Sequence, residues 1–460
     1  MSSWPNDIAD MHNKFGVTKW VNEASFHKQS ELLKLRMRML LEEFQETMDA
    51  YLQEDKQEFV DGLVDLCVIA IGTMQIAGVD PQEAWNEVLH ANKSKEVGIL
   101  KSKGESTDLV FKDLKVLSDK IKDLEKEQRG LSSNLKNALL EIPNTPHETS
   151  PDGLSEKDNI VVSEKGVKKD FNFEIKDHIE LGKQLDILDF EVAAKMSGSG
   201  FPLYKGDGAL LERALINFMI DYHLKNFNYT EFFTPYLVKP ESAVTTGQLP
   251  KFSEDMYHIE KDDLFLIPTA EVPLTNIHKD DILKVNDLPK YYLGYSSCFR
   301  REAGSYGKDT RGLLRVHQFN KVELVKFVEP ENSYKELELL VKQATNILDL
   351  LELDYRIIEL CAGDLSFAAA KCFDLEVWAP GEKKWLEVSS CSNFEDFQSR
   401  RGNIRFKNND GKLDFLHTLN GSGLATPRIF AAFIETHQNE DGTISTVSYT
   451  HLTLPTILLV

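Results

Sequence analysis

The sequence predicts a multidomain protein: an all-α N-terminal domain, a partial coiled-coil helix, and an α+β domain built on an antiparallel sheet. Three observations support this fold class. Residues 1–100 carry apolar side chains at helical spacing, residues 107–141 follow a heptad pattern, and helices alternate with short β-rich runs from about residue 175 to 444. With 460 residues, the chain is long enough for two or three domains.

The first domain, placed at residues 1–103, is expected to be nearly all helix. Residues 31–52, ELLKLRMRMLLEEFQETMDAYL, have helical periodicity without Gly or Pro, and residues 58–80 form a second, more apolar helix. That second helix is therefore expected to be the more buried of the two. A third helix begins near residue 80, with Asp80 as its N-cap and Pro81 at its first position.

Apolar residues alternate four and three apart along residues 107–141, which is the spacing of a coiled-coil seam. The seam consists of Val110, Leu114, Leu117, Ile121, Leu124, Leu131, Leu135 and Ala138, with Gln128 as its polar member. The helix is expected to stop at Pro143. We assign residues 104–142 to this single arm helix and residues 143–174, rich in Pro, Ser and Asp, to a linker.

Residues 175–444 are expected to form the α+β domain. Helices are predicted over residues 209–227 and 332–353. The predicted strands are residues 264–269, 315–328, 355–360, 373–380 and 384–390. Their alternating apolar pattern favours an antiparallel sheet with helices on its flanks.

Composition limits the functional classes. The formal charge of −21 argues against non-specific binding of nucleic acid and against DNA as a partner, but it allows a local basic surface that grips one RNA. No apolar run is judged long enough to span a membrane, and the N-terminus lacks a signal-peptide pattern. The five cysteines show no metal-ligand or disulfide spacing. A reducing cytoplasm is the expected location.

One stretch concentrates cations in this acidic chain: FRREAGSYGKDTRGLLRVHQFNKVEL, residues 299–324. The planar donors of Arg300 suit a phosphate, and Glu302 beside it can hold that fork or accept from a nucleobase amine. Lys321 and Glu323 point to the same face of the returning strand, which indicates a polar pocket. A solvated charge cluster on a hairpin is the simpler interpretation of the RRE sequence taken alone.

Three further motifs carry polar side chains. IPTAEVPLTN puts Thr269 and Glu271 on one strand face, and WLEVSSCSNFEDFQSRR puts Glu387 and Ser390 beside an arginine pair. HTLNGSGLATPR contains a Gly/Ser turn followed by an apolar helix with Arg428 in its first turn. A helix N-terminus with an arginine suits an anion.

These motifs, in this order, resemble the bacterial-type seryl-tRNA synthetases, a family of class II aminoacyl-tRNA synthetases. The resemblance covers residues 104–444 and includes IPNTPHETSP, DHIELGKQLDILDFE, GQLPKF and GDLSF. It implies a homodimer built on an antiparallel sheet, with class II motif 1 around Pro235, a dimer-interface element. FRRE…RVHQFNKVE resembles motif 2, and GSGLATPR resembles motif 3. The implied substrates are L-serine, ATP and tRNA(Ser).

The resemblance also implies a role for each site residue. Serine would be held by Thr269, Glu271, Glu323, Asn420 and Ser422. ATP would be held by Arg300 on the α-phosphate, Glu302 on the adenine amine, Val316 beside the base, and Arg428 on the γ-phosphate. Glu387 and Ser390 would coordinate Mg²⁺ on the phosphates. Catalysis would depend on Arg300 and Arg428, which neutralise charge.

The N-terminal domain carries two acidic helix faces. They consist of Glu42, Glu43 and Glu46 on one helix, and Glu58, Asp61 and Asp65 on the next. Such carboxylates suit Mg²⁺ or Mn²⁺, although solvated helix charge explains most strings of this kind. The order LLEEFQE…EFVDGLVDLCVIAIGT…AWNEVLHANKSK resembles MazG-type all-α nucleoside triphosphate pyrophosphohydrolases. That resemblance implies that the carboxylates bind metal and that Asn92 and Lys93 contact the nucleotide.

Two features leave alternatives open. Seryl-tRNA synthetases of this type begin with two long antiparallel helices that grip the long variable arm of the tRNA, and only the second is expected here. The chain could therefore be a regulatory or interaction protein that does not charge tRNA, or a chimeric sequence in which the N-terminal hydrolase is the native enzyme. Residues 445–460, STVSYTHLTLPTILLV, depart from the resemblance and are interpreted as an anomalous tail, an artefact of assembly or truncation.

Overall fold

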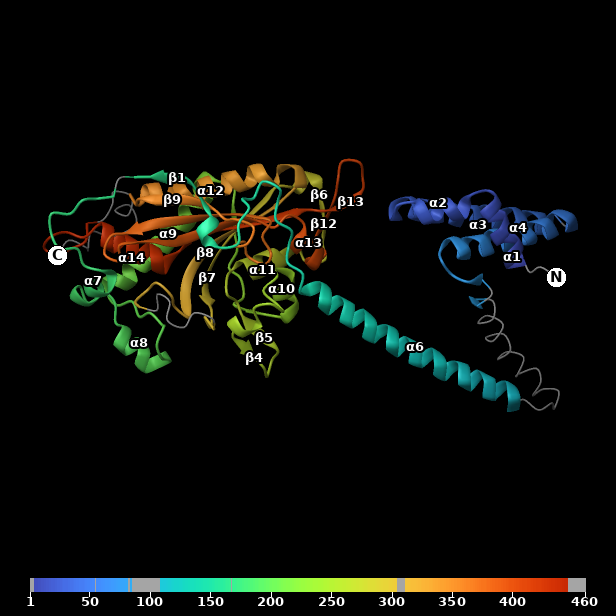
Figure 1. Ribbon diagram of the computed structural model, residues 1–460, viewed down its shortest axis with the longest axis horizontal. Coiled ribbons are helices and arrows are strands. Elements are labelled where there is room, and N and C mark those ends of the chain that lie inside the picture. The colour runs from blue at the N-terminus through green and yellow to red at the C-terminus, as the bar shows by residue number, and fades with distance from the viewer. Residues whose placement is uncertain are drawn as a thin grey trace. The chain divides into compact units, whose positions relative to one another are not determined.

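The computed structural model describes residues 4–53, 55–81, 83–84, 108–166, 168–303 and 311–445. The chain divides into two units, Met1–Ser133 and Asn134–Val460, which are described separately. Figure 1 shows the helices of the first unit and the sheet-based architecture of the second. The predicted anomalous tail lies outside the described residues except for Ser445.

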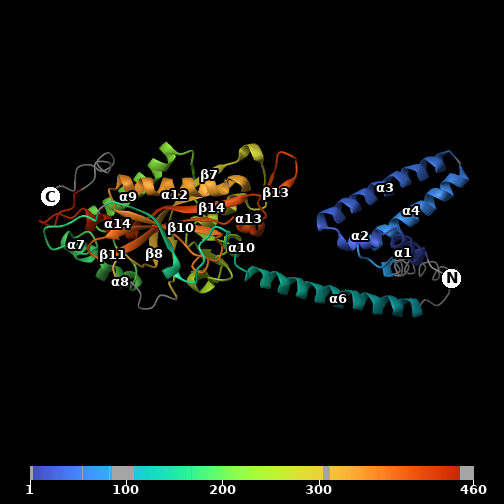
Figure 2. The same ribbon diagram turned by 45° about the horizontal axis from the view of Figure 1, so that its top comes forward.

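The first unit is helical, as predicted. Its helices are α1 (Trp4–Lys14), α2 (Val17–Glu23), α3 (Phe26–Leu52), α4 (Lys56–Ile76) and the first part of α6 (Asp108–Leu140). Helices α3 and α4 lie side by side along their length (Figure 2). Arg36 of α3 links them, because it donates from Nη2 to the carbonyl of Ile69 at 3.0 Å and from Nε to Thr73 Oγ1 at 3.1 Å.

The start of the predicted third helix is present. Asp80 Oδ1 accepts the backbone N–H of Glu83 at 3.3 Å, which is the hydrogen bond expected of an N-cap. Residues 85–107 lie outside the described part of the chain, so Asn92 and Lys93 have no place in the structure described here.

Helix α4 corrects two expectations. Its 21 residues are apolar enough, by length and composition alone, to cross a membrane, whereas no segment was predicted to be long enough. It was also predicted to be buried, yet only 11% of its apolar window is covered within the chain. Because α4 packs along α3, we assign the apolar side chains that face α3 to helix–helix packing.

Helix α6 confirms the predicted arm helix. Seam residues with described side chains are largely exposed in the single chain, among them Ile121, Leu124, Leu131 and Leu135. An uncovered heptad seam is unfavourable in water, because such seams are normally buried against a second helix.

The second unit is an α+β domain, as predicted. Its main sheet has the order β1-β9-β10-β11-β14-β8-β7-β2, and its pairs are antiparallel except β2 with β7. These strands are β1 (Ile160–Lys165), β9 (Tyr355–Glu359), β10 (Lys371–Ala379), β11 (Lys384–Asn393), β14 (His417–Ala425), β8 (Gln318–Val328), β7 (Lys290–Phe299) and β2 (Thr230–Glu231). The predicted strand runs in this sheet are all confirmed.

Two small sheets and several helices complete this unit. The small sheets are β13 (Leu413–Phe415), β12 (Arg405–Lys407) and β6 (Ile282–Lys284), and β3 (Leu237–Val238), β5 (Leu264–Leu266) and β4 (His258–Ile259). The helices are α7 (His178–Gln184), α8 (Phe190–Ser197), α9 (Asp207–Asn226), α10 (Pro240–Thr245), α11 (Glu271–Thr275), α12 (Ser333–Leu350), α13 (Phe397–Gly402) and α14 (Thr426–Thr436). Short 3₁₀ turns lie at Glu156–Asp158, Ser253–Asp255, Asn276–His278, Val285–Asp287 and Pro330–Asn332.

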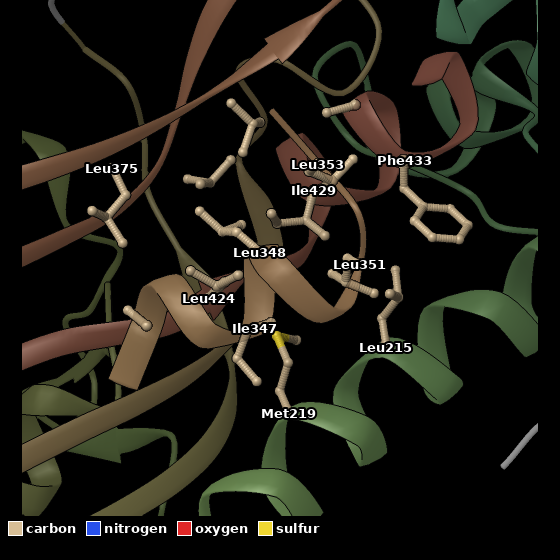
Figure 3. Close-up of a cluster of buried hydrophobic side chains, with 14 of the residues drawn as sticks. Leu215, Met219, Ile347, Leu348, Leu351, Leu353, Leu375, Leu424, Ile429 and Phe433 are labelled. Carbon is tan, nitrogen blue, oxygen red and sulfur yellow. The ribbon is translucent and has the colours of Figure 1, made fainter. Parts of the chain in front are cut away.

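Helices α9, α12 and α14 cover one face of the main sheet and form its core. Figure 3 shows Leu215 and Met219 of α9, Ile347 and Leu348 of α12, and Phe433 of α14 gathered in this core. Side chains alternate along a strand, so the neighbours of core residues on β8 and β14 point to the opposite face. That opposite face carries the candidate site.

The five cysteines, all within the described residues, are free thiols, in agreement with the absence of a disulfide pattern. Four of them, Cys298, Cys361, Cys372 and Cys391, are buried in the second unit. They behave as small core residues there, because burial raises the pKa of Cys298, Cys372 and Cys391 and keeps the thiols protonated.

Candidate active site

A cavity of about 700 Å³ opens on the sheet face opposite the core helices. It brings together motifs that are up to 160 positions apart, as the sequence predicted. The predicted site residues on its wall are Thr269, Glu271, Arg300, Glu302, Val316, Glu387, Ser390, Asn420, Ser422 and Arg428. Glu323, the remaining predicted residue of this site, is fully buried behind that wall.

Glu323 is the centre of a buried polar network at one end of the cavity. Its Oε2 accepts from Thr269 Oγ1 at 2.9 Å and pairs with Lys321 Nζ at 2.6 Å. Its Oε1 accepts from Asn420 Nδ2 at 2.9 Å. The same-face placement of Lys321 and Glu323 is confirmed, and the charge of Glu323 is compensated by three donors.

Glu271 lies beside this network and is almost completely buried. Gln398 Nε2 donates to its Oε1 at 2.7 Å, and Asn420 Nδ2 donates to its Oε2 at 3.0 Å. Burial, and secondly the charge of Glu323, raises the pKa of Glu271 to about 7. A cationic group entering this end of the cavity would be attracted by two carboxylates at once.

The backbone around Thr269 corrects the sequence interpretation. Thr269 and Glu271 were expected on one strand face, but β5 ends at Leu266, and Glu271 is the first residue of α11. Thr269 Oγ1 accepts the backbone N–H of Glu271 at 3.2 Å, so a helix start, rather than strand periodicity, places both side chains in the cavity. Pro268 and Pro273 favour this change, since proline interrupts strand hydrogen bonding.

Arg300 follows directly after β7, at the predicted strand end. Its guanidinium lies over the ring of Phe319, 5.1 Å from the ring centre, and Nε donates to the carbonyl of Pro268 at 3.4 Å. Arg300 also lines the cavity. Residues 304–310 of the cation-rich loop lie outside the described part.

Glu302 sits in the left-handed region with φ 52°, which turns the chain back toward the cavity. Its Oε2 pairs with Arg315 Nη1 at 2.6 Å. Asp255 supports the same turn, because its Oδ1 accepts the backbone N–H of Ala303 at 2.8 Å. Val316 lines the cavity next to Arg315.

Arg428 lies in the first turn of α14, as predicted. Nε donates to the carbonyl of Leu314 at 3.0 Å, and Nη1 donates to the carbonyl of Glu387 at 2.8 Å. The preceding Gly/Ser segment was predicted to be a turn, but it is part of β14. Glycine is needed for close packing there, since a Cβ on Gly421 would lie 3.0 Å from Cys391 Sγ.

Glu387 and Ser390 both reach the cavity although they are three residues apart on β11. Side chains at that spacing point to opposite faces of a regular strand. The register explains the exception: Ser389 pairs with Leu375 and Glu387 pairs with Glu376, so Val388 is an extra residue in a β-bulge. The bulge turns both oxygen groups to the same face.

These two residues fit a divalent cation. Mg²⁺ takes oxygen ligands, and a carboxylate and a hydroxyl stand together here. Behind them, burial and then the charge of Glu387 raise the pKa of Asp374 to about 8. Two carboxyl groups, Glu387 and Asp374, thus lie close to Ser390, and Arg428 Nη1 lies 3.6 Å from Glu387 Oε2. The predicted arginine pair does not contribute: Arg401 stacks on Phe397, and Arg400 pairs with Asp396.

The acidic residues of the N-terminal domain are placed on α3 and α4, with Glu42, Glu46, Glu58, Asp61 and Asp65 exposed. Glu43 is the innermost, and burial, then the charges of Asp65, Glu46 and Glu42, raises its pKa. Asp61 and Asp65 lie in an apolar helix sequence, but their side chains are exposed in the single chain, so burial does not make these carboxylates costly there. Among the described residues, the group of ligands that lie within 4.8 Å of one another is instead His178, Glu382 and Glu435.

Sequence reasoning missed several residues that shape the cavity. Gln398 lies on α13 and bonds to Glu271, Phe319 supports Arg300, and Arg315 holds Glu302. Gln398 and Phe319 lie inside quoted motifs, but their partners, Glu271 and Arg300, come from other elements. Only the three-dimensional register assigns them to the site.

Three family models match parts of the chain. Residues 253–437 match the model of the tRNA synthetase class II core domain (G, H, P, S and T). Residues 89–146 match the seryl-tRNA synthetase N-terminal domain. Residues 9–92 match phosphoribosyl-ATP pyrophosphohydrolase, which confirms the resemblance of the first domain to all-α nucleotide pyrophosphohydrolases.

Individual relatives cover most of the chain. A serine–tRNA ligase of Chloroherpeton thalassium is 53% identical over 348 residues, which are 75% of this chain and 82% of the relative. One from Geobacillus kaustophilus is 54% identical, over 76% of this chain and 83% of the relative. The crystal structure of seryl-tRNA synthetase from Pyrococcus horikoshii complexed with ATP has a TM-score of 0.70 at 31% identity and covers 98% of this chain and 95% of that one. The chain therefore belongs to the serine–tRNA ligase family of class II aminoacyl-tRNA synthetases, with a pyrophosphohydrolase-like domain at its N-terminus.

Proposed function

We propose that this chain activates L-serine with ATP to form seryl-adenylate and transfers the seryl group to tRNA(Ser). One observation carries the proposal: a buried pair of carboxylates, Glu271 and Glu323, lies at one end of a cavity whose other walls carry Arg300 and Arg428. Serine has an ammonium group for the first end and ATP has phosphates for the second. A single cavity with both chemistries suits the joining of these two substrates.

On the serine side, Glu271 and the Thr269–Glu323 pair receive the ammonium and the hydroxyl of serine, and Asn420 and Ser422 complete the wall. Of the two carboxylates, Glu271 lines the cavity, whereas Glu323 is fully buried and paired with Lys321. This arrangement favours a small polar amino acid, because a hydroxyl group can hydrogen-bond to the polar wall and an apolar side chain cannot.

On the ATP side, Arg300 holds the α-phosphate, Arg428 the γ-phosphate, and Glu302 and Val316 the adenine. The serine carboxylate then attacks the α-phosphorus in line, and pyrophosphate leaves. The residues position the two reactants and neutralise the charge that develops on the phosphate oxygens. Glu387 and Ser390 would hold Mg²⁺, which would supply positive charge beside the phosphates.

The partners implied by this activity are part of the proposal. A homodimer is supported by the apolar surface beside Pro235, where Phe233 is 80% exposed and Leu237 is 40% exposed in the single chain. Helix α6 is proposed to contact the long variable arm of tRNA(Ser). A cytoplasmic location follows from these substrates and from free thiols.

We also propose a second activity, a Mg²⁺- or Mn²⁺-dependent nucleotide pyrophosphohydrolase in residues 1–103. The match over residues 9–92 and the raised pKa of Glu43 beside Asp65 favour it. The carboxylates of α3 and α4 would bind the metal, which would activate a water molecule.

We also propose the remaining domain boundaries. They are residues 104–142 for the arm, 143–174 for the linker and 175–444 for the catalytic domain.

The direct test of the first step is serine-dependent exchange between ATP and labelled pyrophosphate by the full chain. Exchange is expected with serine and is expected to be much weaker with alanine, which lacks the hydroxyl. Absence of exchange with serine would contradict the proposal. Exchange without transfer to tRNA would favour the regulatory or chimeric alternatives.

A further inference from the structure

His178 is a fully buried histidine outside the cavity that the reaction does not use. It is the first residue of α7, and its ring contacts segments that are distant in sequence. Nε2 lies 3.1 Å from the backbone nitrogen of Leu313, and Nδ1 lies 2.9 Å from Glu435 Oε1. The ring thus joins the loop before β8 to the last turn of α14.

The hydrogen-bond pattern fixes which ring nitrogen carries the proton. The backbone N–H of Leu313 can only donate, so Nε2 of His178 accepts and is unprotonated. Nδ1 therefore carries the hydrogen and donates it to Glu435. The neutral ring has one donor and one acceptor. Both make hydrogen bonds, the donor to Glu435 and the acceptor to Leu313.

Glu435 is a rigid anchor for this ring. Its Oε1 also accepts the backbone N–H of His178 at 2.8 Å, and its Oε2 accepts the N–H groups of Gly381 and Glu382 at 2.9 and 3.1 Å. The carboxylate is fully buried and fully bonded. The cluster with Glu382 has the spacing of a metal site, but these backbone donors already occupy Glu435, so we assign it to structure.

Helix α14 consequently holds two successive residues of the loop. Arg428, in the first turn of this helix, donates to the carbonyl of Leu314. Glu435, in its last turn, is linked to the N–H of Leu313 through the ring of His178. Both leucines line the cavity, and Arg315 and Val316 follow them directly. Displacement of the loop at Leu313 would therefore move the proposed adenine contacts.

Gly312 shows how closely the ring and loop approach. Its φ is +61°, and a Cβ built there would overlap Nε2 of His178. Only glycine both adopts this backbone conformation without strain and leaves room for the imidazole. The backbone at Gly312 therefore packs directly against the buried imidazole of His178.

We propose that His178 is a positioning residue for ATP: its Nε2 fixes the loop at residues 312–314 and thereby holds the adenine side of the cavity in place. The proposal rests on the ATP contacts given under Proposed function. Serine binding is not expected to depend on His178, because Thr269, Glu271 and Asn420 are held by other elements.

Two substitutions in the full chain separate the ring's two bonds. His178→Asn keeps a donor near the Nδ1 position for Glu435 but lacks an acceptor for Leu313, whereas His178→Gln can place its amide oxygen near the Nε2 position. In serine-dependent pyrophosphate exchange, we expect His178→Asn to raise the KM for ATP about tenfold, the loss of one buried hydrogen bond, and to leave the KM for serine within about twofold. His178→Gln is expected to keep the KM for ATP within about threefold while lowering the melting temperature more.

Equal KM values for ATP in wild type and His178→Asn would overturn the proposal, as would a parallel rise in the KM for serine. If His178→Asn does not fold, Gly312→Ala is the substitute, because its Cβ pushes the loop from the same ring. It is expected to raise the KM for ATP selectively, and an unchanged value would likewise overturn the proposal. Wild-type protein without any serine-dependent exchange would instead refute the proposed function itself.

Discussion

The side-chain amide of Asn420 donates to Oε2 of Glu271 at 3.0 Å. The same nitrogen lies 2.9 Å from Oε1 of Glu323, so one neutral amide stands between two buried carboxylates. Lys321 compensates only Glu323 directly. The ammonium of a bound amino acid would supply the missing positive charge. The pocket therefore favours a cationic ligand.

The raised pKa of Glu271 predicts a pH dependence for serine. Its pKa lies above the ordinary value, at about 7, so the carboxylate becomes protonated as the pH falls through 7. The protonated form attracts an ammonium poorly. We expect kcat/KM for serine in pyrophosphate exchange to fall below pH 7, approaching about tenfold per pH unit.

Glu271→Gln is the control for this prediction. It resembles the protonated form in shape and lacks its titration, so its activity is expected to be low and nearly flat between pH 6 and 8. A wild-type profile that is flat over the same range would show that Glu271 does not govern serine binding.

Arg300 and Arg301 give a matched pair of substitutions. Arg300 lines the cavity, whereas the side chain of Arg301 is exposed and does not. Arg300→Ala is expected to reduce serine-dependent exchange by roughly a hundredfold or more, because a charge that meets the α-phosphate is lost. Arg301→Ala is expected to stay near wild type, and near-normal exchange in Arg300→Ala would refute the assigned role.

The proposed hydrolase activity depends on carboxylates outside the synthetase cavity. Release of pyrophosphate from nucleoside triphosphates by the full chain is expected to require Mg²⁺ or Mn²⁺ and to be lost in the double substitution Glu43→Gln, Asp65→Asn. Serine-dependent exchange should be unchanged in that variant, because both residues lie on α3 and α4 of the first unit. Hydrolysis that persists in it would remove these carboxylates from the reaction.

The exposed seam of α6 can be tested by a charge. Leu131→Asp places a carboxylate in the heptad seam, and Ser133→Asp adds the same charge outside it on a neighbouring exposed position. Transfer of serine to tRNA is expected to fall about tenfold or more in the first variant only, since a seam charge disfavours packing against any partner helix. Exchange, which needs no tRNA, should be equal in both, and equal transfer would mean that the seam has no role.

Much of this site was predictable where a single periodicity decides the geometry. Lys321 and Glu323 share a face because strands repeat every two residues, and Arg428 opens α14 because the sequence marks the helix start. Prediction failed where the backbone departs from a regular period. The bulge at Val388 has no clear local signal, and Gln398 depends on the packing of α13 against distant elements. The helix start at Glu271 has a signal in Pro268 and Pro273, which the strand interpretation did not use.

The acidic N-terminal faces show a different limit. Helical spacing predicts two acidic faces on successive helices, and the structure places Asp65 near enough to Glu43 to raise its pKa. What packs against these exposed faces is not given by the spacing. A periodic pattern identifies a face and leaves its partner undefined. The seam of α6 is the same case.

The most direct measurement is attachment of labelled serine to a tRNA with a long variable arm by the purified full-length chain. We expect serine to be attached in the presence of ATP and Mg²⁺, and attachment to disappear in Arg300→Ala. Serine-dependent pyrophosphate exchange without any attachment to tRNA would contradict the proposal that this chain is a working serine–tRNA ligase.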